Sequence, residues 1–307
     1  MKSRKIPLLC AASAMAVLIL DSRGSLRFAS DAIELCIRTV MPSLFPFFVL
    51  SIYLTGNLGS KSAKAAVITA GFLGGYPVGA QAAAEAYENG QLTKAQADKL
   101  LMFCSQAGPS FLFGMVASQF PHLRYGWMLW AVQLCSAATV ALISGQDTSP
   151  SPVIHSPATT LAQAMKKATQ AMASVCGWVV LFRILTGHLG RLSMADGLYI
   201  LLSGFAELTN GSLLLAQITD VSIRFLIAAL ILNFGGICVL LQTASVARGL
   251  DLRRYLTGKA LQTFFSLCYG LCFIGIFWGT LPVFLAIFMY FLRNLRNNSS
   301  IPARIGV

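Results

Sequence analysis

The sequence predicts an all-α polytopic membrane protein, and three observations support this fold class. Hydrophobic residues make up 56% of the 307 residues and charged residues only 11%, whereas a soluble domain carries roughly 25% charged residues. Several apolar runs approach the ~20 residues that a helix needs to cross a bilayer. These runs are continuously apolar, whereas strands of a membrane barrel alternate polar and apolar residues. We therefore expect about eight to ten hydrophobic helical segments.

The apolar runs extend along most of the chain. They lie near residues 6–20, 34–55, 65–84, 100–118, 127–144, 171–187, 197–216, 223–247, 260–279 and 281–292. The first run follows a basic N-terminus, as in a secretory signal, but no small-residue cleavage site precedes Asp21, so we expect an uncleaved span. Basic residues near both chain ends predict cytoplasmic termini, and the basic segment 248–259 is predicted to be cytoplasmic as well.

Three features recur in the same order in the two halves of the chain, at a nearly constant offset. They are Leu54-Thr-Gly-Asn-Leu-Gly59 with Leu185-Thr-Gly-His-Leu-Gly190, Gly71-Phe72 with Gly204-Phe205, and Gly108 with Gly235-Gly236. This order predicts two internal repeats, which are inverted in the membrane if three crossings separate them.

The predicted domains follow from these repeats. They are an N-terminal span and connection (1–30), a first repeat (31–144), a polar linker rich in Ser, Thr and Pro (145–160), a second repeat (161–292) and a basic tail (293–307). Within the first repeat, residues 85–99 predict a helical hairpin with a turn at Asn89-Gly90. Thr93 and Gln96 then form a capping box for the next helix.

The run 65–84 contains the most informative motif, Gly71-Phe-Leu-Gly-Gly-Tyr-Pro-Val-Gly-Ala80. Tyr76 precedes a proline and is pushed toward an extended conformation, while Pro77 fits the first position of a new helix. We expect a broken helix whose non-helical backbone is buried in protein or lines a cavity. The amides of Val78, Gly79 and Ala80 then lie unpaired at a helix start that carries roughly half a positive charge. The alternative is a plain kink, because Gly and Pro are common in membrane helices.

The run 100–118 repeats this pattern. Gly108 allows a break and Pro109 starts a second helix, whose first amides belong to Ser110 and Phe111. The side chains of Ser105, Gln106 and Ser110 add neutral hydrogen-bond donors. Two such helix starts are predicted to hold one carboxylate each.

Polar residues also interrupt two apolar runs of the second half. Glu207 lies in the run 197–216 together with Asn210, and Asn233 precedes Gly235-Gly236. An ionised carboxylate at the bilayer centre costs about 2.5–3.5 kcal/mol, so such a residue is expected to have a function. Glu207 either couples proton or cation movement or pairs with Arg183. The alternative is a charge-paired or interfacial glutamate without a role in transport.

Other site chemistries find little support in the sequence. The cysteines and histidines are not spaced as metal ligands, and no nucleophile stands in a cluster with a base, so we expect neither an enzyme nor a metal or cofactor. The basic residues lie between apolar runs instead of on one soluble face, which argues against nucleic acid as a partner. Membrane lipids are the expected macromolecular surroundings, and a homo-oligomer is compatible with the sequence.

Several of these motifs resemble a known family. Met41-Pro-Ser-Leu-Phe-Pro-Phe-Phe48, Gly71 to Ala80, Leu100-Leu-Met-Phe-Cys104 and Ala107-Gly-Pro-Ser-Phe111 are similar to the YlbJ-type sporulation integral membrane proteins, which carry the nucleoside recognition Gate domain. The resemblance covers about residues 31–291, and Glu207-Leu-Thr-Asn-Gly211 is similar to the family's second-half motif. It implies two Gate-like repeats, the outer forespore membrane as location, and movement of dipicolinic acid toward the forespore. The family usually has two asparagines where this chain has Ser105-Gln106, and this departure bears on substrate identity.

Together these features predict a carrier of a small organic anion, dipicolinate, that works by alternating access. The predicted binding residues are Tyr76, Val78, Gly79, Ser105, Gln106, Gly108, Ser110, Phe111, Asn210 and Asn233. The ring of Tyr76 or Phe111 is expected to stack on the aromatic substrate. Two alternatives remain: a nucleoside transporter, and an assembly factor of the spore envelope that transports nothing.

Overall fold

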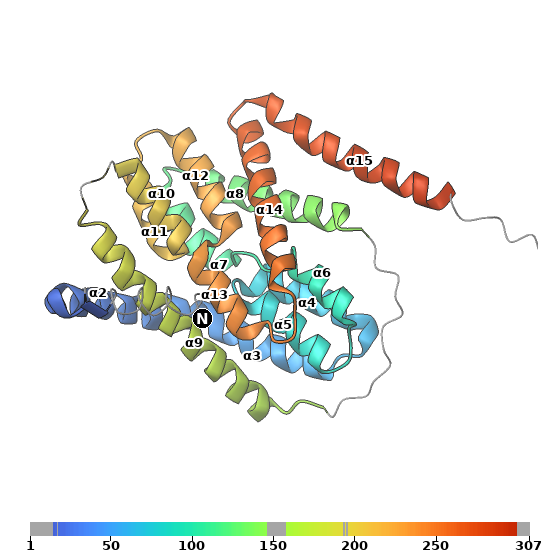
Figure 1. Ribbon diagram of the computed structural model, residues 1–307, viewed down its shortest axis with the longest axis horizontal. Coiled ribbons are helices and arrows are strands. Elements are labelled where there is room, and N and C mark those ends of the chain that lie inside the picture. Colours follow the sequence, from blue (N-terminus) through green and yellow to red (C-terminus); the bar gives the residue numbers. More distant parts are fainter. Residues whose placement is uncertain (1–14, 17, 146–157, 193, 195, 300–307) are drawn as a thin grey trace, which may run out of the picture.

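The computed structural model describes residues 15–16, 18–145, 158–192, 194 and 196–299, and all regular structure among them is helical (Figure 1). The first half contains α2 (Ser22–Leu35), η2 (Cys36–Val40), α3 (Met41–Asn57), α4 (Ser60–Gly74), α5 (Val78–Glu88), α6 (Lys94–Leu101), α7 (Pro109–Phe111), η3 (Leu112–Val116), η4 (Ala117–Gln119) and α8 (Arg124–Ile143). The second half contains α9 (Leu161–Leu189), α10 (Asp196–Ala206), α11 (Leu208–Leu214), η5 (Leu215–Gln217), α12 (Val221–Phe234), α13 (Gly236–Val246), α14 (Leu252–Phe273), η6 (Phe277–Gly279) and α15 (Thr280–Ser299). The predicted all-helical fold class is confirmed.

Four helical stretches in the described residues are long and apolar enough to cross a membrane. They are Ser22–Asn57, Arg124–Ile143, Leu161–Leu189 and Val221–Val246. Three shorter apolar helices span Ser62–Gly74, Gly197–Ala206 and Phe277–Ile287. The polytopic membrane architecture is therefore supported, although fewer than eight segments are long enough to cross by themselves, because several of the predicted runs are broken.

The predicted boundaries differ from the structure at several points. Most of the run 6–20 and most of the linker 145–160 lie outside the described residues. The predicted boundary at residue 30 falls inside α2, since α2, the π-helical turn η2 and α3 form one continuous helix. At the other end, α15 continues to Ser299 and so includes part of the predicted basic tail.

The predicted helix breaks are present, and each has a local cause. α4 ends at Gly74 and α5 begins at Val78, because Gly75 adopts a positive φ (+87°) with an extended ψ (−178°), which interrupts the helix. Pro77 precedes the first helical residue and does not occupy it, which corrects the sequence-based expectation. α7 begins at Pro109 after the non-helical segment 102–108, as predicted.

The second half has two breaks of the same kind. α10 and α11 are separated by Glu207, whose backbone is extended (φ −147°, ψ 120°). α12 and α13 are separated by Gly235 in a left-handed conformation (φ +84°). Only glycine adopts such a conformation without strain, so the Gly-Gly pair determines where this helix divides.

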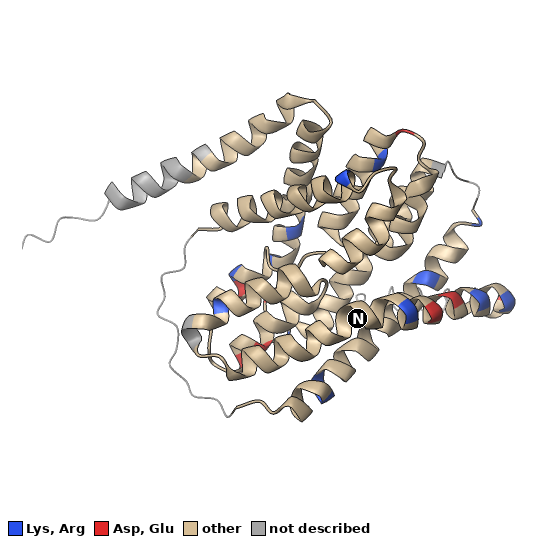
Figure 2. Cartoon of the chain, turned by 180° about the vertical axis from the view of Figure 1, so that it is seen from behind, with Lys and Arg blue, Asp and Glu red and all other residues tan. Residues whose placement is uncertain are grey.

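The broken helices lie between two groups of longer helices (Figure 1). α3 packs against α9, and α2 packs against α9 as well. In the other group, α14 packs against both α8 and α12. Charged residues concentrate on α2 and near helix ends, while long stretches of the central helices carry none (Figure 2). This distribution is typical of a protein whose outer surface faces lipid.

The two halves share an order of elements and a pattern of close glycine contacts. A Cβ atom on Gly79 would overlap Gly71 and the carbonyl group of Cys104, and one on Gly211 would overlap Gly204. Each half thus brings its broken pair, α4–α5 or α10–α11, into glycine-to-glycine contact. The common order agrees with the predicted repeats, while their origin by duplication and their inversion remain predictions.

The hairpin between α5 and α6 has the predicted form. Gly90 adopts φ +66° in the turn, and the side chains of Thr93 and Gln96 form both hydrogen bonds of the capping box. The break before Val78 and this hairpin fix the length of α5, which is buried along most of its residues.

The glycine contacts lead to a stability prediction. Gly79→Ala should lower the free energy of unfolding by about 1–3 kcal/mol, because the added methyl group meets backbone atoms that cannot move aside easily. Thermal unfolding of the purified protein in detergent measures this change. The matched control is Gly177→Ala in α9, where nothing lies within 4 Å of the added Cβ atom. Equal melting temperatures for the two variants would contradict the proposed packing.

Candidate functional site

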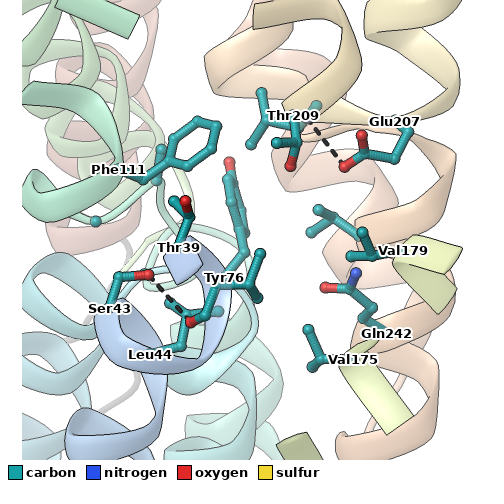
Figure 3. Close-up of a pocket in the computed structure, with 16 residues that line it drawn as sticks. Thr39, Ser43, Leu44, Tyr76, Phe111, Val175, Val179, Glu207, Thr209 and Gln242 are labelled. Atoms are coloured by element: carbon teal, nitrogen blue, oxygen red, sulfur yellow. Dashed lines mark hydrogen bonds between the residues drawn. The ribbon is translucent and has the colours of Figure 1, made fainter. Parts of the chain in front are cut away.

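A pocket lies where the helix breaks of the two halves meet (Figure 3). Its empty volume is about 520 Å³. The first half contributes the segment from Thr39 to Leu44, the break residues Gly75 and Tyr76, and residues Ala107, Gly108 and Phe111. The second half contributes Val175 and Val179 of α9, the break residues Glu207 to Thr209, and Val239 and Gln242 of α13. Residues from six separate segments of the chain therefore form one cavity wall.

Tyr76 occupies the centre of this arrangement. In Figure 3 its ring stands between Phe111 on one side and Glu207 and Gln242 on the other. The side chain is only 5% exposed, and its hydroxyl group donates a hydrogen bond to the backbone oxygen of Leu232 at 3.0 Å. Tyr76 thus connects the break between α4 and α5 to the end of α12.

The Tyr76 hydroxyl oxygen also accepts a hydrogen bond from Nζ of Lys259 at 2.8 Å. Lys259 lies in α14 and is 1% exposed. Its ammonium group also donates to the carbonyl oxygen of Ser105, to Oε1 of Gln262 at 3.1 Å and to the carbonyl oxygen of Asn233 at 3.3 Å. Nζ lies 4.6 Å from the centre of the Tyr76 ring, within the range of a cation–π contact.

Lys259 is buried in the protein and thus differs from the exposed Arg253 and Arg254 of the basic segment 248–259. The cytoplasmic location of that segment stays a prediction. The spacing of polar residues in the sequence indicates the burial of Lys259. Lys259, Gln262 and Ser266 lie on one face of α14, and all three are buried. A polar stripe at helical spacing inside an apolar run faces protein rather than lipid.

Three of the predicted binding residues belong to the network around Lys259 rather than to the pocket wall. Gln106 and Gln262 donate to each other, with distances of 3.0 and 2.5 Å, and Gln262 also donates to Oδ1 of Asn233 at 2.9 Å. Ser105 contributes its carbonyl oxygen to Lys259. Ser105, Gln106 and Asn233 are completely buried. The Ser105 carbonyl and the side chains of Gln106 and Asn233 bond other segments of the protein, while the Ser105 hydroxyl group has no hydrogen-bond partner in the described structure.

Glu207 caps the start of α11. Its carboxylate accepts hydrogen bonds from the backbone amides of Thr209 at 2.9 Å and Asn210 at 2.7 Å. Arg183 donates to Oδ1 of Asn210 and not to Glu207, and Nδ2 of Asn210 donates to Oγ1 of Thr186 at 2.7 Å. The structure therefore joins Glu207, Asn210 and Arg183 in one cluster, but without the direct Glu207–Arg183 hydrogen bond that was one of the two expectations.

The predicted amide donors at the starts of α5 and α7 differ in their surroundings. The amide of Val78 donates to the backbone oxygen of Gly75 at 2.8 Å, so it is not unpaired as expected. Gly79 packs against the Cys104 carbonyl group, and neither Val78 nor Gly79 lines the pocket. At the second restart, Gly108 and Phe111 line the pocket, while the side chain of Ser110 is exposed. No side chain caps α5 or α7.

The chain is similar to the sporulation integral membrane protein YlbJ of Bacillus subtilis (strain 168). The two are 24% identical over an alignment that covers 87% of this chain and 80% of the relative. This similarity supports the YlbJ-type assignment that the motifs predict and a membrane role in sporulation. No family model matches the chain, and no solved structure is significantly similar to it.

The position of Tyr76 leads to a second stability prediction. Tyr76→Phe removes the hydroxyl group that accepts a hydrogen bond from Lys259 and donates one to the backbone oxygen of Leu232. Buried polar groups then lose a partner, so the free energy of unfolding should fall by about 1–3 kcal/mol. Tyr53→Phe is the matched control, since Tyr53 is 39% exposed. Thermal unfolding of both variants compares the two effects. If Tyr76→Phe melts at the wild-type temperature, the hydroxyl group has no structural role.

Proposed function

We propose that the chain is a sporulation membrane transporter that carries a small organic anion, dipicolinic acid, across the outer forespore membrane by alternating access. The starting point is the similarity to a sporulation integral membrane protein. The proposal assigns transport to the pocket at the helix breaks, and it assigns no enzymatic activity.

One observation carries this proposal: the pocket is lined by non-helical backbone of both halves of the chain. Gly75 and Gly108 of the first half and Glu207 of the second half lie in its wall. Irregular backbone at membrane depth is tolerated only where protein surrounds it or where it lines a cavity. Secondary transporters place substrate in this position, between repeats whose discontinuous helices meet near the midplane. Movement of one half against the other would then open the site to alternate sides.

The chemistry of the wall supports a flat anion as the substrate. Phe111 is half-buried at the pocket and Tyr76 forms its centre, so two aromatic rings are available for stacking. The start of α7, where Gly108 and Phe111 line the pocket, has no side-chain cap, whereas Glu207 supplies a carboxylate to the start of α11. Glu207 thus illustrates, within the protein, the type of group that an uncapped helix start accepts.

The charges near the pocket favour the same conclusion. Lys259 bonds the hydroxyl group of the pocket residue Tyr76. Arg183 bonds the side chain of Asn210, which follows the pocket residue Thr209. The carboxylate of Glu207 is compensated by two backbone amides. Two basic side chains therefore lie near the pocket with one carboxylate, which is already hydrogen-bonded. This charge balance favours a negatively charged substrate.

A nucleoside is the second candidate substrate, and Glu207 is the observation that favours it. A carboxylate in the pocket wall repels an anion at short range, whereas it accepts hydrogen bonds from ribose hydroxyl groups. Gln242 and Thr209 add neutral polar groups to the same wall.

Binding of labelled dipicolinate to the purified protein tests the proposal. Wild type should bind dipicolinate, and an excess of uridine should not displace it. Phe111→Ala should raise the dissociation constant about tenfold, because a stacking contact and its buried area contribute about 1.4 kcal/mol. Phe277→Ala is the control, since Phe277 is 73% exposed.

The outcomes separate the alternatives. Binding of labelled uridine, with no binding of labelled dipicolinate, would identify a nucleoside carrier. A protein that binds neither compound, while spores of a deletion strain contain normal dipicolinate, would support the assembly factor instead. Deletion spores that lack dipicolinate and recover when it is supplied externally would agree with the transport function.

A further inference from the structure

Three segments meet at the ammonium group of Lys259. They are the break at Tyr76 after α4, the non-helical stretch at Ser105 after α6, and the last turn of α12 at Asn233. Lys259 bonds the hydroxyl group of Tyr76 and the carbonyl groups of Ser105 and Asn233. The Asn233 carbonyl group lies at the C-terminal end of a helix, which carries roughly half a negative charge.

The hydrogen-bond partners of Nζ fit the charged form of the side chain. An ammonium group has three N–H donors, whereas a neutral amine has two and a lone pair. The oxygens of Ser105, Asn233 and Gln262 can only accept. The hydroxyl group of Tyr76 donates its own hydrogen to another carbonyl group, so toward Lys259 it acts as an acceptor too. Four acceptors with no donor match a cation and leave no role for a lone pair.

In secondary transporters, unwound carbonyl groups and the C-terminal ends of broken helices coordinate the coupling ion. The site around Lys259 has these features, but its cation belongs to the chain. We propose that the Lys259 ammonium group takes the place of a coupling metal cation, so that the protein binds its substrate without Na⁺ or K⁺ from solution. This inference rests on the proposed function as a carrier.

The position of the cation explains how it would act on the substrate site. Ser105 belongs to the first half and Asn233 to the second, so the ammonium group connects the two halves. The Tyr76 ring, whose centre lies 4.6 Å from Nζ, also lines the pocket. The buried cation therefore fixes the break residues and also presents positive potential to the pocket, two tasks that a bound metal ion would otherwise perform.

The first experiment measures melting of purified full-length protein in NaCl, KCl and choline chloride at equal ionic strength. Wild type should melt at the same temperature in all three salts. Lys259→Ala should melt at least about 5 °C lower, because the oxygens lose their cation. Na⁺ should then enter the vacated space and raise the melting temperature of this variant by about 2–4 °C over choline.

Two variants serve as controls. Lys166→Ala removes an exposed lysine from α9 and should have no effect in any salt. Lys259→Met keeps the length of the side chain without its charge. It should melt lower than wild type and gain nothing from Na⁺, because the methionine fills the space that the ion needs.

The second experiment measures uptake of labelled dipicolinate into proteoliposomes. Wild-type uptake should not change when N-methylglucamine replaces Na⁺ and K⁺, and uptake by Lys259→Ala should depend on Na⁺. Wild-type protein without uptake would count against the proposed function, while the melting data would still decide the role of Lys259.

Three results would overturn the inference. The first is Na⁺- or K⁺-dependent melting or dipicolinate binding of wild type. The second is a folded Lys259→Ala protein that Na⁺ does not stabilise more than choline, and the third is Lys259→Met with wild-type stability and uptake. If neither variant at position 259 folds, the salt comparison on wild type decides alone.

Discussion

A backbone that leaves its helix inside a membrane must find hydrogen-bond partners within the protein, and this requirement organises the structure. The described breaks meet that requirement by lying against one another and against a few long polar side chains. Lys259 binds carbonyl groups of two breaks, Gln133 of α8 donates to the backbone oxygen of Ala107 at 2.9 Å, and Glu207 accepts from the amides of α11. The convergence of the breaks, and with it the pocket, follows from this need for partners.

The long helices α8 and α14 act as supports in this scheme. Each is unbroken, and each extends a polar side chain to a break that belongs to a different segment. An interior amide or ammonium group at the end of a long side chain reaches carbonyl groups that no neighbouring helix could satisfy. Such a group is costly to bury alone, so it specifies one arrangement of the broken helices over others.

The local parts of the fold could be predicted from the sequence. The breaks near Pro77 and Pro109 follow from glycine and proline chemistry, and the capping box at Thr93 follows from the spacing of two residues. These features depend on neighbours within a few positions. For the same reason the sequence identified Glu207 as unusual, because a carboxylate inside an apolar run is recognisable without any knowledge of its partners.

The partners themselves could not be predicted in this way. Lys259 and Ser105 are far apart in the chain, and nothing in either local pattern indicates that they meet. Tyr76 was expected to face the substrate, yet its hydroxyl group is committed to Leu232 and Lys259. Long-range packing decides whether a polar side chain binds a ligand or bonds another part of the protein. Periodicity and composition do not contain that information.

The reciprocal amide pair of Gln106 and Gln262 changes the meaning of one departure from the family pattern. An asparagine at position 106 is one methylene group shorter, so it would not reach the amide of α14 in this backbone geometry. Variation at this position is therefore a matter of matching side-chain lengths across two segments. A short amide at this position would need a compensating change at position 262 to keep the pair.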